Sequence, residues 1–405
     1  MGSGATDVVV VGAGVIGLSI AWRCAQRGLA VTVLDPAPGS GATWTAAGML
    51  APATELHYEG RPLLALTLDS AARYPGFVAE LADATGVDVG YRRCGTLQAA
   101  WDAADLAALR DLHAFQSSLG IESELLTSRQ LRAAEPALAA GLPGGLWAAD
   151  DHQIDNRMLH GALRRAAGGA GVREVTARVG GWLRRGQQVV GVRTESGDRF
   201  EAGTVVLAAG AWSAAVAELP AQTGPSTPAG LQVPAGLQAS AGLPAEVVPP
   251  VRPVKGQTLR LRGPSDLLNH VVRGAVRGSP VYVVPRGDGS LVIGASSEEA
   301  GFDLGPRAGA VYELLRDAQL LLPVLGEVRF DEVSTGLRPG SPDNLPMIGG
   351  TVVDGLLVAT GHYRNGILLA PLTADAVAGL ITGEDPGIDL TACDPRRFSR
   401  SEVSA

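Results

Sequence analysis

Three glycines and one acid near the start of the chain have the spacing of a dinucleotide-binding site. The glycines are Gly12, Gly14 and Gly17, in the pattern G-x-G-x-x-G, and the acid is Asp35. Gly12 permits a tight turn, Gly14 lets the backbone approach a pyrophosphate, and Gly17 lets a helix pack closely on a strand. The carboxylate of Asp35 can accept hydrogen bonds from a ribose. The chemistry indicated is binding of NAD or FAD, and this motif alone leaves both open.

Such a motif needs a strand before it and a helix after it, and the sequence predicts both. Residues 8–11 have the length and β-branched content of a buried parallel strand. A helical pattern follows and stops at Gly28, and a second apolar strand over 31–34 leads into Asp35. The helix N-terminus offers free N–H groups and about half a positive charge to a phosphate. A glycine-rich turn without a ligand is the alternative, which the complete βαβ context disfavours.

Composition limits the remaining possibilities. A chain of 405 residues exceeds one ordinary core, so we expect two domains. The hydrophobic content of 46% and charged content of 18% are typical of a soluble globular protein. The net charge is −8, basic residues are scattered, and Lys255 is the only lysine, so we expect no nucleic-acid partner. Because no apolar run reaches the ~18 residues of a membrane span, we expect no membrane partner either.

Neither the cysteines nor the acidic residues form a pattern of metal ligands. Cys24, Cys94 and Cys393 are far apart, which predicts neither a disulfide framework nor a zinc site and favours a cytoplasmic protein. The run 150–155 is rich in Asp and His, but no second cluster of ligands accompanies it. We therefore expect no metal, and we interpret Asp155 as the N-terminal cap of a helix over 158–167.

Hydrophobic patterns predict the other elements. Helices are expected over 63–81, kinked or broken at Pro75-Gly76, and over 106–119, 307–322 and 367–381. Strands are expected over 189–194, 204–208, 252–262, 328–338 and 356–360, with a hairpin over 280–295. Residues 221–250 are dominated by Pro, Gly, Ala and Gln, which predicts a largely irregular inserted surface loop that is dispensable for chemistry.

Four segments taken together resemble one family. They are the βαβ unit, Trp44 to Pro52, Tyr282 to Arg286, and Gly336 to Pro339 together with Gly361 to Ile367. The resemblance is to the glycine oxidases of thiamin biosynthesis, within the superfamily of FAD-dependent D-amino-acid and sarcosine oxidases. It covers the whole chain except the Pro-rich insert. It implies FAD as the cofactor and an α/β fold, with a Rossmann-type FAD-binding domain and a second antiparallel-sheet substrate domain interleaved in sequence.

The expected domain ranges follow from this pattern. Residues 1–84, 148–215 and 326–405 are assigned to the FAD-binding domain. Residues 85–147 and 216–325, with the 221–250 insert, are assigned to the substrate-binding domain.

The resemblance also implies how a substrate is held. A carboxylate in a partly dry site needs a paired cation, and a bidentate arginine fits best. By its match to the family motif this arginine is Arg338, with the Tyr282 hydroxyl as second donor and Arg364 beside the substrate amine. The alternatives are a surface salt bridge for Arg338 and an ordinary sheet aromatic for Tyr282. We interpret His362 as structural, because hydride transfer from a neutral amine needs no base.

The flavin contacts expected from the same resemblance are Gly12, Gly14, Val15, Ile16, Gly17, Asp35, Thr43, Ala46, Ala47, Gly48, Met49, Val179, Ala209, Gly210, Arg364, Asn365, Gly366, Ile367 and Leu368. A helix starting near Gly366 is expected to aim its free N–H groups at the flavin ring. Two positions depart from the superfamily. Gly336 lies about where sarcosine oxidases tether the flavin through cysteine, which predicts non-covalent FAD, and Asp35 replaces the usual glutamate.

The activity implied is oxidative deamination of glycine by oxygen, giving glyoxylate through the imine, ammonia and hydrogen peroxide, for the thiazole branch of thiamin synthesis. The partners are then a small amino acid and molecular oxygen, and a homo-oligomer is expected. Two alternatives stay open. One is an oxidase or dehydrogenase of D-amino acids or sarcosine, and the other is a non-catalytic FAD-binding protein.

Overall fold

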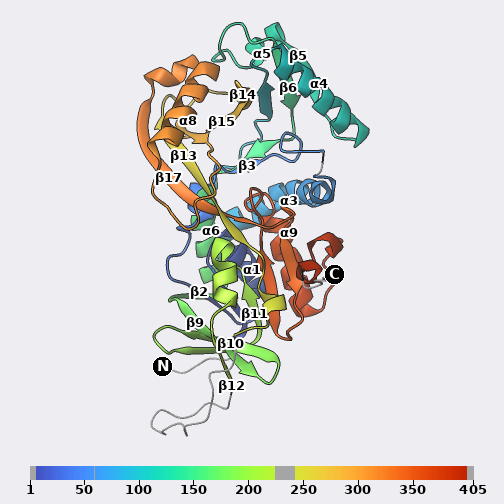
Figure 1. Ribbon diagram of the computed structural model, residues 1–405, viewed down its shortest axis with the longest axis vertical. Coiled ribbons are helices and arrows are strands. Elements are labelled where there is room, and N and C mark those ends of the chain that lie inside the picture. The colour runs from blue at the N-terminus through green and yellow to red at the C-terminus, as the bar shows by residue number, and fades with distance from the viewer. Residues whose placement is uncertain (1–5, 59, 224–241, 399–405) are drawn as a thin grey trace, which may run out of the picture.

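Two large sheets form the framework of the protein. The computed structural model describes residues 6–58, 60–223 and 242–398. Within these ranges the strands form one sheet of nine strands and one of eight, besides a two-stranded pair. The nine-stranded sheet lies in the lower part of Figure 1 and the eight-stranded sheet in the upper part. The expected α/β architecture with a second sheet is thereby confirmed.

The nine-stranded sheet contains the predicted βαβ unit at its centre. Its parallel strands and their first helix are β1 (Thr6–Val11), α1 (Val15–Gln26), β2 (Val31–Asp35), β8 (Arg173–Thr176), β11 (Arg199–Leu207) and β19 (Leu356–Thr360). In β1, Val11 lies opposite Leu34 of β2 on one side and Leu207 of β11 on the other. Because α1 connects β1 to β2, its N-terminus lies at the carboxyl end of β1, where ligands of such sheets bind.

Both faces of this parallel sheet are covered, which explains the unbroken valine run of β1. Val8 and Val10 face a core shared with helices, whereas Val9 and Val11 face a core shared with an antiparallel extension of the sheet. The helices are α1, α3 (Arg61–Thr85), α6 (Asn156–Gly169) and α9 (Ala370–Thr382). The extension consists of β9 (Val179–Arg185), β10 (Gln188–Thr194) and β12 (Ala221–Thr223), and β18 (Met347–Gly350) pairs with β19.

Two predictions about these elements change. The helix expected to be kinked or broken at Pro75 is continuous from Arg61 to Thr85. Pro75 has no N–H to donate, but the buried residues Tyr74, Phe77 and Leu81 hold the helix against its neighbours. The predicted insert is not irregular at its start, because β12 pairs with β9. Residues 224–241 of the insert lie outside the described residues.

The eight-stranded sheet provides the second framework. Its strands, in chain order, are β4 (Thr96–Ala99), β5 (Glu124–Thr127), β6 (Gly144–Ala148), β13 (Arg252–Arg262), β14 (Val271–Val276), β15 (Ser279–Pro285), β16 (Ser290–Gly294) and β17 (Arg329–Gly340). All neighbours are antiparallel except β14 and β4. The predicted hairpin is present as β15 and β16. Helices α4 (Ala103–Ser118), α5 (Ser128–Ala134) and α8 (Ala308–Leu321) pack against this sheet.

Two strands do not join the sheet that their predicted domain ranges imply. β17 falls within 326–405 but pairs along its length with β13, whereas β12 falls within 216–325 but pairs with β9. A local sequence pattern does not specify which sheet a strand joins, because that depends on long-range pairing. We therefore propose domain boundaries after β12 and after β17, near residues 224 and 341.

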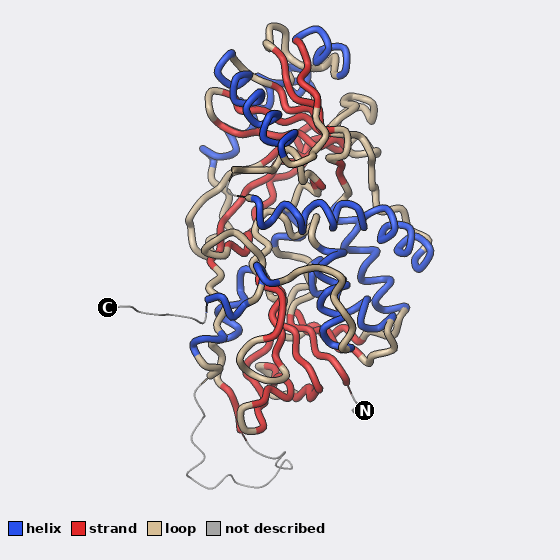
Figure 2. Tube along the Cα trace, turned by 90° about the vertical axis from the view of Figure 1, so that its right-hand side faces the viewer, coloured by secondary structure: helices blue, strands red, loops and turns tan. Residues whose placement is uncertain are grey.

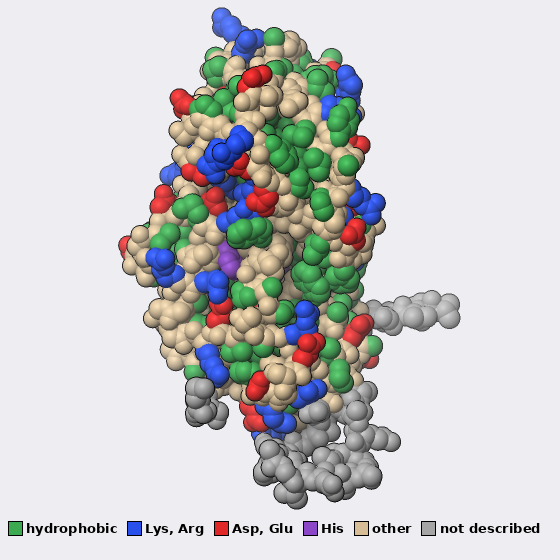
Figure 3. All heavy atoms as spheres, turned by 90° about the vertical axis from the view of Figure 1, so that its left-hand side faces the viewer, with side chains coloured by type: hydrophobic (Ala, Val, Ile, Leu, Met, Phe, Trp, Pro, Cys, Tyr) green, Lys and Arg blue, Asp and Glu red, His purple; other side chains and the backbone are tan. Residues whose placement is uncertain are grey.

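The two sheets occupy separate ends of the molecule, with α3 between them (Figure 2). No helix in the ranges that the structure describes is long and apolar enough to cross a membrane. On the face shown in Figure 3, acidic and basic side chains are interspersed.

Candidate functional site

A cavity of about 580 Å³ lies where the carboxyl ends of β1, β2, β11 and β19 meet strands β13, β15 and β17. Its lining includes every predicted site residue except Gly17 and Leu368. Residues about 350 positions apart in sequence, such as Gly12 and Arg364, therefore line one space. A cavity at the carboxyl ends of parallel strands is the expected ligand site of such a sheet.

The glycine motif is built as its spacing predicts. Gly12 has φ +113°, and a side chain there would overlap the carbonyl of Ala208 at the end of β11. A side chain at Gly17 would overlap the carbonyl of Gly12, so this glycine allows α1 to pack on the turn and does not itself line the cavity. Helix α1 has no acidic residue in its first turn and no side-chain cap at Gly14. Its positive end is therefore suited to a pyrophosphate.

Asp35 lies at the edge of the cavity with part of its hydrogen-bonding capacity in use. One carboxylate oxygen accepts a hydrogen bond from the Ala13 N–H at 2.7 Å, and the other accepts one from the Ala37 N–H at 2.7 Å. A carboxylate has about four acceptor positions, so Asp35 can accept further bonds from a ribose. The shorter acid is thus compatible with a dinucleotide.

A small-residue segment forms another wall. Helix α2 (Ala42–Thr45) leads into it, and β3 (Met49–Leu50) follows. Gly48 has φ +72°, and a side chain there would overlap the carbonyl of Ile154. Thr43, Ala46, Ala47, Gly48 and Met49 all line the cavity, as predicted.

A buried arginine that the sequence interpretation missed holds this wall in place. Arg286, directly after β15, is 3% exposed and contacts both the wall and the start of α6. Its Nη2 donates to the Ala47 carbonyl at 2.6 Å, and its Nε lies 3.5 Å from Asp155 Oδ2. Further acceptors are the Ile154 carbonyl at 2.7 Å, Asn156 Oδ1 at 3.3 Å and the side chain of Gln153. Burial lowers the pKa of Arg286 to about 10.

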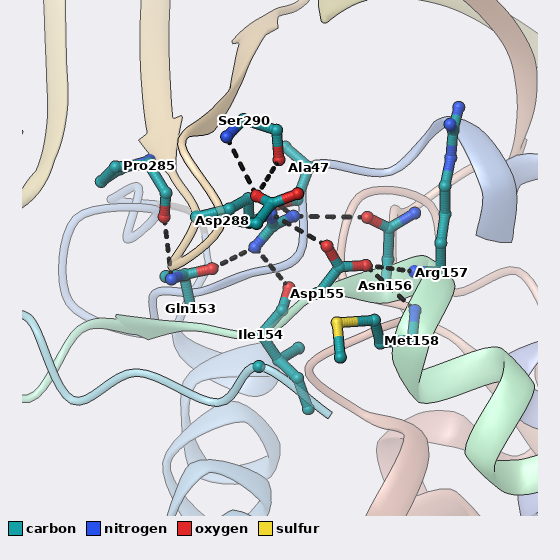
Figure 4. Close-up of polar contacts among 12 residues, drawn as sticks. Ala47, Gln153, Ile154, Asp155, Asn156, Arg157, Met158, Pro285, Asp288 and Ser290 are labelled. Carbon is teal, nitrogen blue, oxygen red and sulfur yellow. Dashed lines mark hydrogen bonds and ion pairs between the residues drawn. The ribbon is translucent and has the colours of Figure 1, made fainter. Parts of the chain in front are cut away.

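The structure confirms the predicted role of Asp155 as a helix cap. Its Oδ1 accepts hydrogen bonds from the N–H groups of Arg157 at 2.9 Å and Met158 at 3.0 Å (Figure 4). The neighbouring Asn156 donates from Nδ2 to the Thr43 carbonyl at 2.7 Å. The start of α6 therefore supports the same wall from behind.

The predicted flavin-ring turn is present, although the helix begins later than expected. Helix α9 starts at Ala370, and the preceding turn closes through a 2.8 Å bond from the Leu369 N–H to the Asn365 carbonyl. In the described chain no acceptor pairs with the N–H groups of residues 366–368. Asn365, Gly366 and Ile367 line the cavity, whereas Leu368 is 2% exposed and its side chain belongs to the core. The side chain of Leu368 therefore does not line the cavity, and its predicted flavin contact stays a prediction that concerns its backbone N–H.

Arg338 and Tyr282 lie together on the other side of the cavity. Arg338 Nη1 donates to the Ser296 carbonyl at 3.1 Å and the Lys255 carbonyl at 3.5 Å. Among the described residues no carboxylate lies within 4 Å of this guanidinium, which contradicts the salt-bridge alternative. Burial lowers the pKa of Arg338 and raises that of Tyr282. The hydroxyl of Tyr282 has no hydrogen-bond partner within the described ranges, so both groups are available to a ligand.

Two glycines on neighbouring strands make room for these side chains. A Cβ at Gly256 of β13 would overlap the guanidinium of Arg338, and a Cβ at Gly294 of β16 would overlap the hydroxyl of Tyr282. Neither glycine belongs to a recognisable motif. Their role becomes visible only in the folded sheet, where Gly294 pairs with Tyr282 and Gly256 lies two positions from Val254, the partner of Arg338.

Arg364 lies in the cavity but is not free. Its Nε is 3.2 Å from Glu55 Oε2, and Arg273 Nη1 is 2.7 Å from Glu55 Oε1. Burial alone would raise the pKa of Glu55, but the two arginines lower it to about 2. The sequence interpretation missed both Glu55 and Arg273, because the three residues come together only in the fold.

Two further residues fill structural positions. His362 lies in the cavity wall with Nε2 3.0 Å from Thr373 Oγ1, and burial lowers its pKa to about 3. It is therefore uncharged at neutral pH, in keeping with a structural role. Lys255 is 0% exposed, and its Nζ contacts Asp303 Oδ2 at 3.2 Å and the Gly305 carbonyl.

The remaining flavin predictions concern Val179, Ala209, Gly210 and Gly336. All four line the cavity, and none of the three cysteines does. A side chain at Gly336 would approach Thr45 Oγ1 to 2.7 Å, so this position is closely packed. Within the described residues no group of three or more His, Cys, Asp or Glu is arranged to hold a metal ion.

The fold and cavity define a dinucleotide-binding protein, and comparison with known proteins identifies it as an oxidoreductase. The chain belongs to the family described as FAD dependent oxidoreductase, whose profile matches residues 7–380. The bifunctional protein ThiO/ThiG of Synechocystis sp. is 35% identical over 97% of this chain and 54% of its own length. This chain spans about half the length of the three bifunctional ThiO/ThiG relatives it matches.

Proteins of similar length also match. The glycine oxidase of Geobacillus kaustophilus is 33% identical over 95% of each chain. The crystal structure of glycine oxidase from the same organism superposes with a TM-score of 0.84, covering 97% of this chain and 98% of that one. The predicted family and the predicted cofactor, FAD, are thereby confirmed, and the residues lining the cavity fit this cofactor.

Proposed function

We propose that the protein oxidises glycine with molecular oxygen to glyoxylate, through the imine, with release of ammonia and hydrogen peroxide. The observation that carries this proposal is that one cavity is lined by both Arg338, which has no acid partner in the described chain, and Tyr282, whose hydroxyl has no hydrogen-bond partner there. The similarity to proteins named glycine oxidase supports it.

Each residue has a proposed role in holding the substrate. The guanidinium of Arg338 binds the carboxylate through two parallel N–H bonds, and the hydroxyl of Tyr282 donates a third. FAD, when bound, would accept the hydride that leaves the α-carbon, and molecular oxygen would reoxidise the reduced flavin. The N–H groups of residues 366–368, which have no acceptor in the described chain, could stabilise negative charge that develops on the flavin. The ammonium group of free glycine first loses a proton to solvent, and hydride transfer from the resulting neutral amine then needs no residue to act as a base.

Several finer points remain proposals. The similarity to ThiO/ThiG proteins supports supply of the thiazole branch of thiamin synthesis. A homo-oligomeric state and a cytosolic location remain predictions from the sequence. Small D-amino acids and sarcosine are the rival substrates, since they would use the same carboxylate anchor.

Anaerobic reduction of the flavin by a panel of amines tests this proposal. Glycine should bleach the flavin absorbance faster than D-alanine, sarcosine or bulky D-amino acids. If another amine of the panel reduced the flavin faster than glycine does, that amine would replace glycine as the proposed substrate. A flavin that no amine reduces would favour a binding protein without this activity.

Non-covalent flavin binding is a separate expectation. Acid or heat precipitation should leave yellow FAD in the supernatant, because no cysteine lines the cavity. Colour that stays with the precipitate would contradict it, and absorbance of the two fractions distinguishes the outcomes.

A further inference from the structure

The arginines around the cavity differ in how they are paired with acids. Arginines 178, 338 and 364 line the cavity, and Arg273 lies behind it. Arg178 is exposed and paired with Glu195 at 3.8 Å. Arg364 and Arg273 share the single carboxylate of Glu55. Arg338 therefore stays the one cavity arginine in the described chain without an acid partner.

Glu55 is held firmly in this shared position. It lies in the turn after β3, whose backbone is fixed by buried Asp151. Asp151 Oδ1 accepts from the Ala53 N–H at 2.9 Å, and Oδ2 accepts from the Thr54 N–H at 2.6 Å. Arg273 also donates to Thr54 Oγ1 at 3.1 Å. Neither the turn nor the carboxylate can move away without breaking several buried bonds.

We propose that Glu55 makes the site selective for ligands with a single anionic group. By pairing Arg364 and Arg273, it removes the second cation that a dicarboxylate would need. A second carboxylate would have to displace Glu55 from Arg364 or lie beside a fixed negative charge. This inference rests on the proposed function, because it takes Arg338 as the anchor of the first carboxylate.

Two ligands of nearly equal size distinguish the effect of ligand charge on binding from the effect of ligand shape. Propionate and malonate each have three carbons, but only malonate carries a second carboxylate. We would measure their dissociation constants by calorimetry on the purified holoenzyme at neutral pH and fixed ionic strength. The wild-type protein should bind propionate at least as tightly as malonate, although three arginines surround the site. Tighter binding of malonate would overturn the proposal without any variant.

The Glu55→Gln variant removes the charge and keeps the size of the side chain. Arg364 and Arg273 then lose their shared acid, so the preference for malonate over propionate should rise by at least about tenfold. Glu55→Asp keeps the charge and should stay within about threefold of the wild-type ratio. A ratio that is unchanged in Glu55→Gln would overturn the proposal.

Glu332→Gln is the matched control. Glu332 is also ion-paired with an arginine, at 2.7 Å from Arg157, and its pKa is likewise lowered to about 2, mainly by that pairing. It does not line the cavity, so the malonate ratio should not change. An equal change in this control would assign the effect to overall charge and contradict the proposal.

These binding ratios do not require turnover. If glycine fails to reduce the flavin but Glu55→Gln gains malonate affinity, the proposed function fails and the selectivity role stands. If propionate binds neither the wild-type protein nor any variant, Arg338 is not an anion site and the inference falls.

Discussion

Replacing Arg338 with alanine should lower the affinity for glycine by roughly thirty- to several-thousand-fold. The substrate carboxylate would then enter a desolvated site without a cation, and truncating one partner of such a pair costs about 2–5 kcal/mol. The effect should appear mainly in KM for glycine and in the dissociation constant of an inert carboxylate such as acetate. Arg338→Lys should recover only part of the lost affinity, because an ammonium cannot form the two parallel N–H bonds of a guanidinium.

A suitable control for this loss is Arg260→Ala. Arg260 of β13 is buried and donates to the Trp44 carbonyl. Like Arg338, it has no acid within 4 Å among the described residues, but it does not line the cavity. Its removal should leave glycine affinity nearly unchanged, and flavin content should be similar in both variants. An Arg338→Ala enzyme that keeps wild-type affinity would show that the carboxylate binds elsewhere.

The second large effect concerns stability. Arg286→Met should lower the free energy of unfolding by about 3–5 kcal/mol, because it leaves buried acceptors and the Asp155 carboxylate without their cation. Urea unfolding of the purified protein measures this change. Affinity for FAD should fall as well, since the Ala47 carbonyl beside the cavity loses its donor (Figure 4). Arg286→Lys should recover a fraction of both properties, because lysine keeps the charge.

Arg164→Met provides the comparison for Arg286. Arg164 lies on α6 and is ion-paired with Glu174, but its side chain is 47% exposed. Exposed pairs contribute about 1 kcal/mol or less, so this variant should be nearly as stable as the wild type and bind FAD normally. If Arg286→Met were no less stable than Arg164→Met, the buried network would not hold the wall of the cavity.

Much of the fold was predictable because its signals are local. The strand, glycine turn, helix and acid of 8–35 lie within one segment, and each residue type has its own backbone consequence. The hairpin of β15 and β16 follows in the same way from a glycine turn between two apolar runs. Pro75 was misleading because tertiary packing of α3 outweighs the local preference of proline.

The site was predictable only where residues belong to motifs. Arg338 and Tyr282 were found through a family pattern, but their neighbours were not. Glu55 meets Arg273 across 218 positions of sequence and Arg364 across 309. Arg286 reaches Ala47 across 239. Such meetings depend on how two sheets are placed against each other, which no short pattern specifies.

The buried position of the single lysine has a practical consequence. Reagents that acylate amines find lysine side chains on most proteins, but in this sequence they can find only Lys255 and the chain's N-terminal amine. Lys255 is sealed beneath Asp303 and the Gly305 carbonyl and has no exposed surface. The rate at which a reagent labels the Lys255 nitrogen therefore reports how often the segment that covers it opens locally.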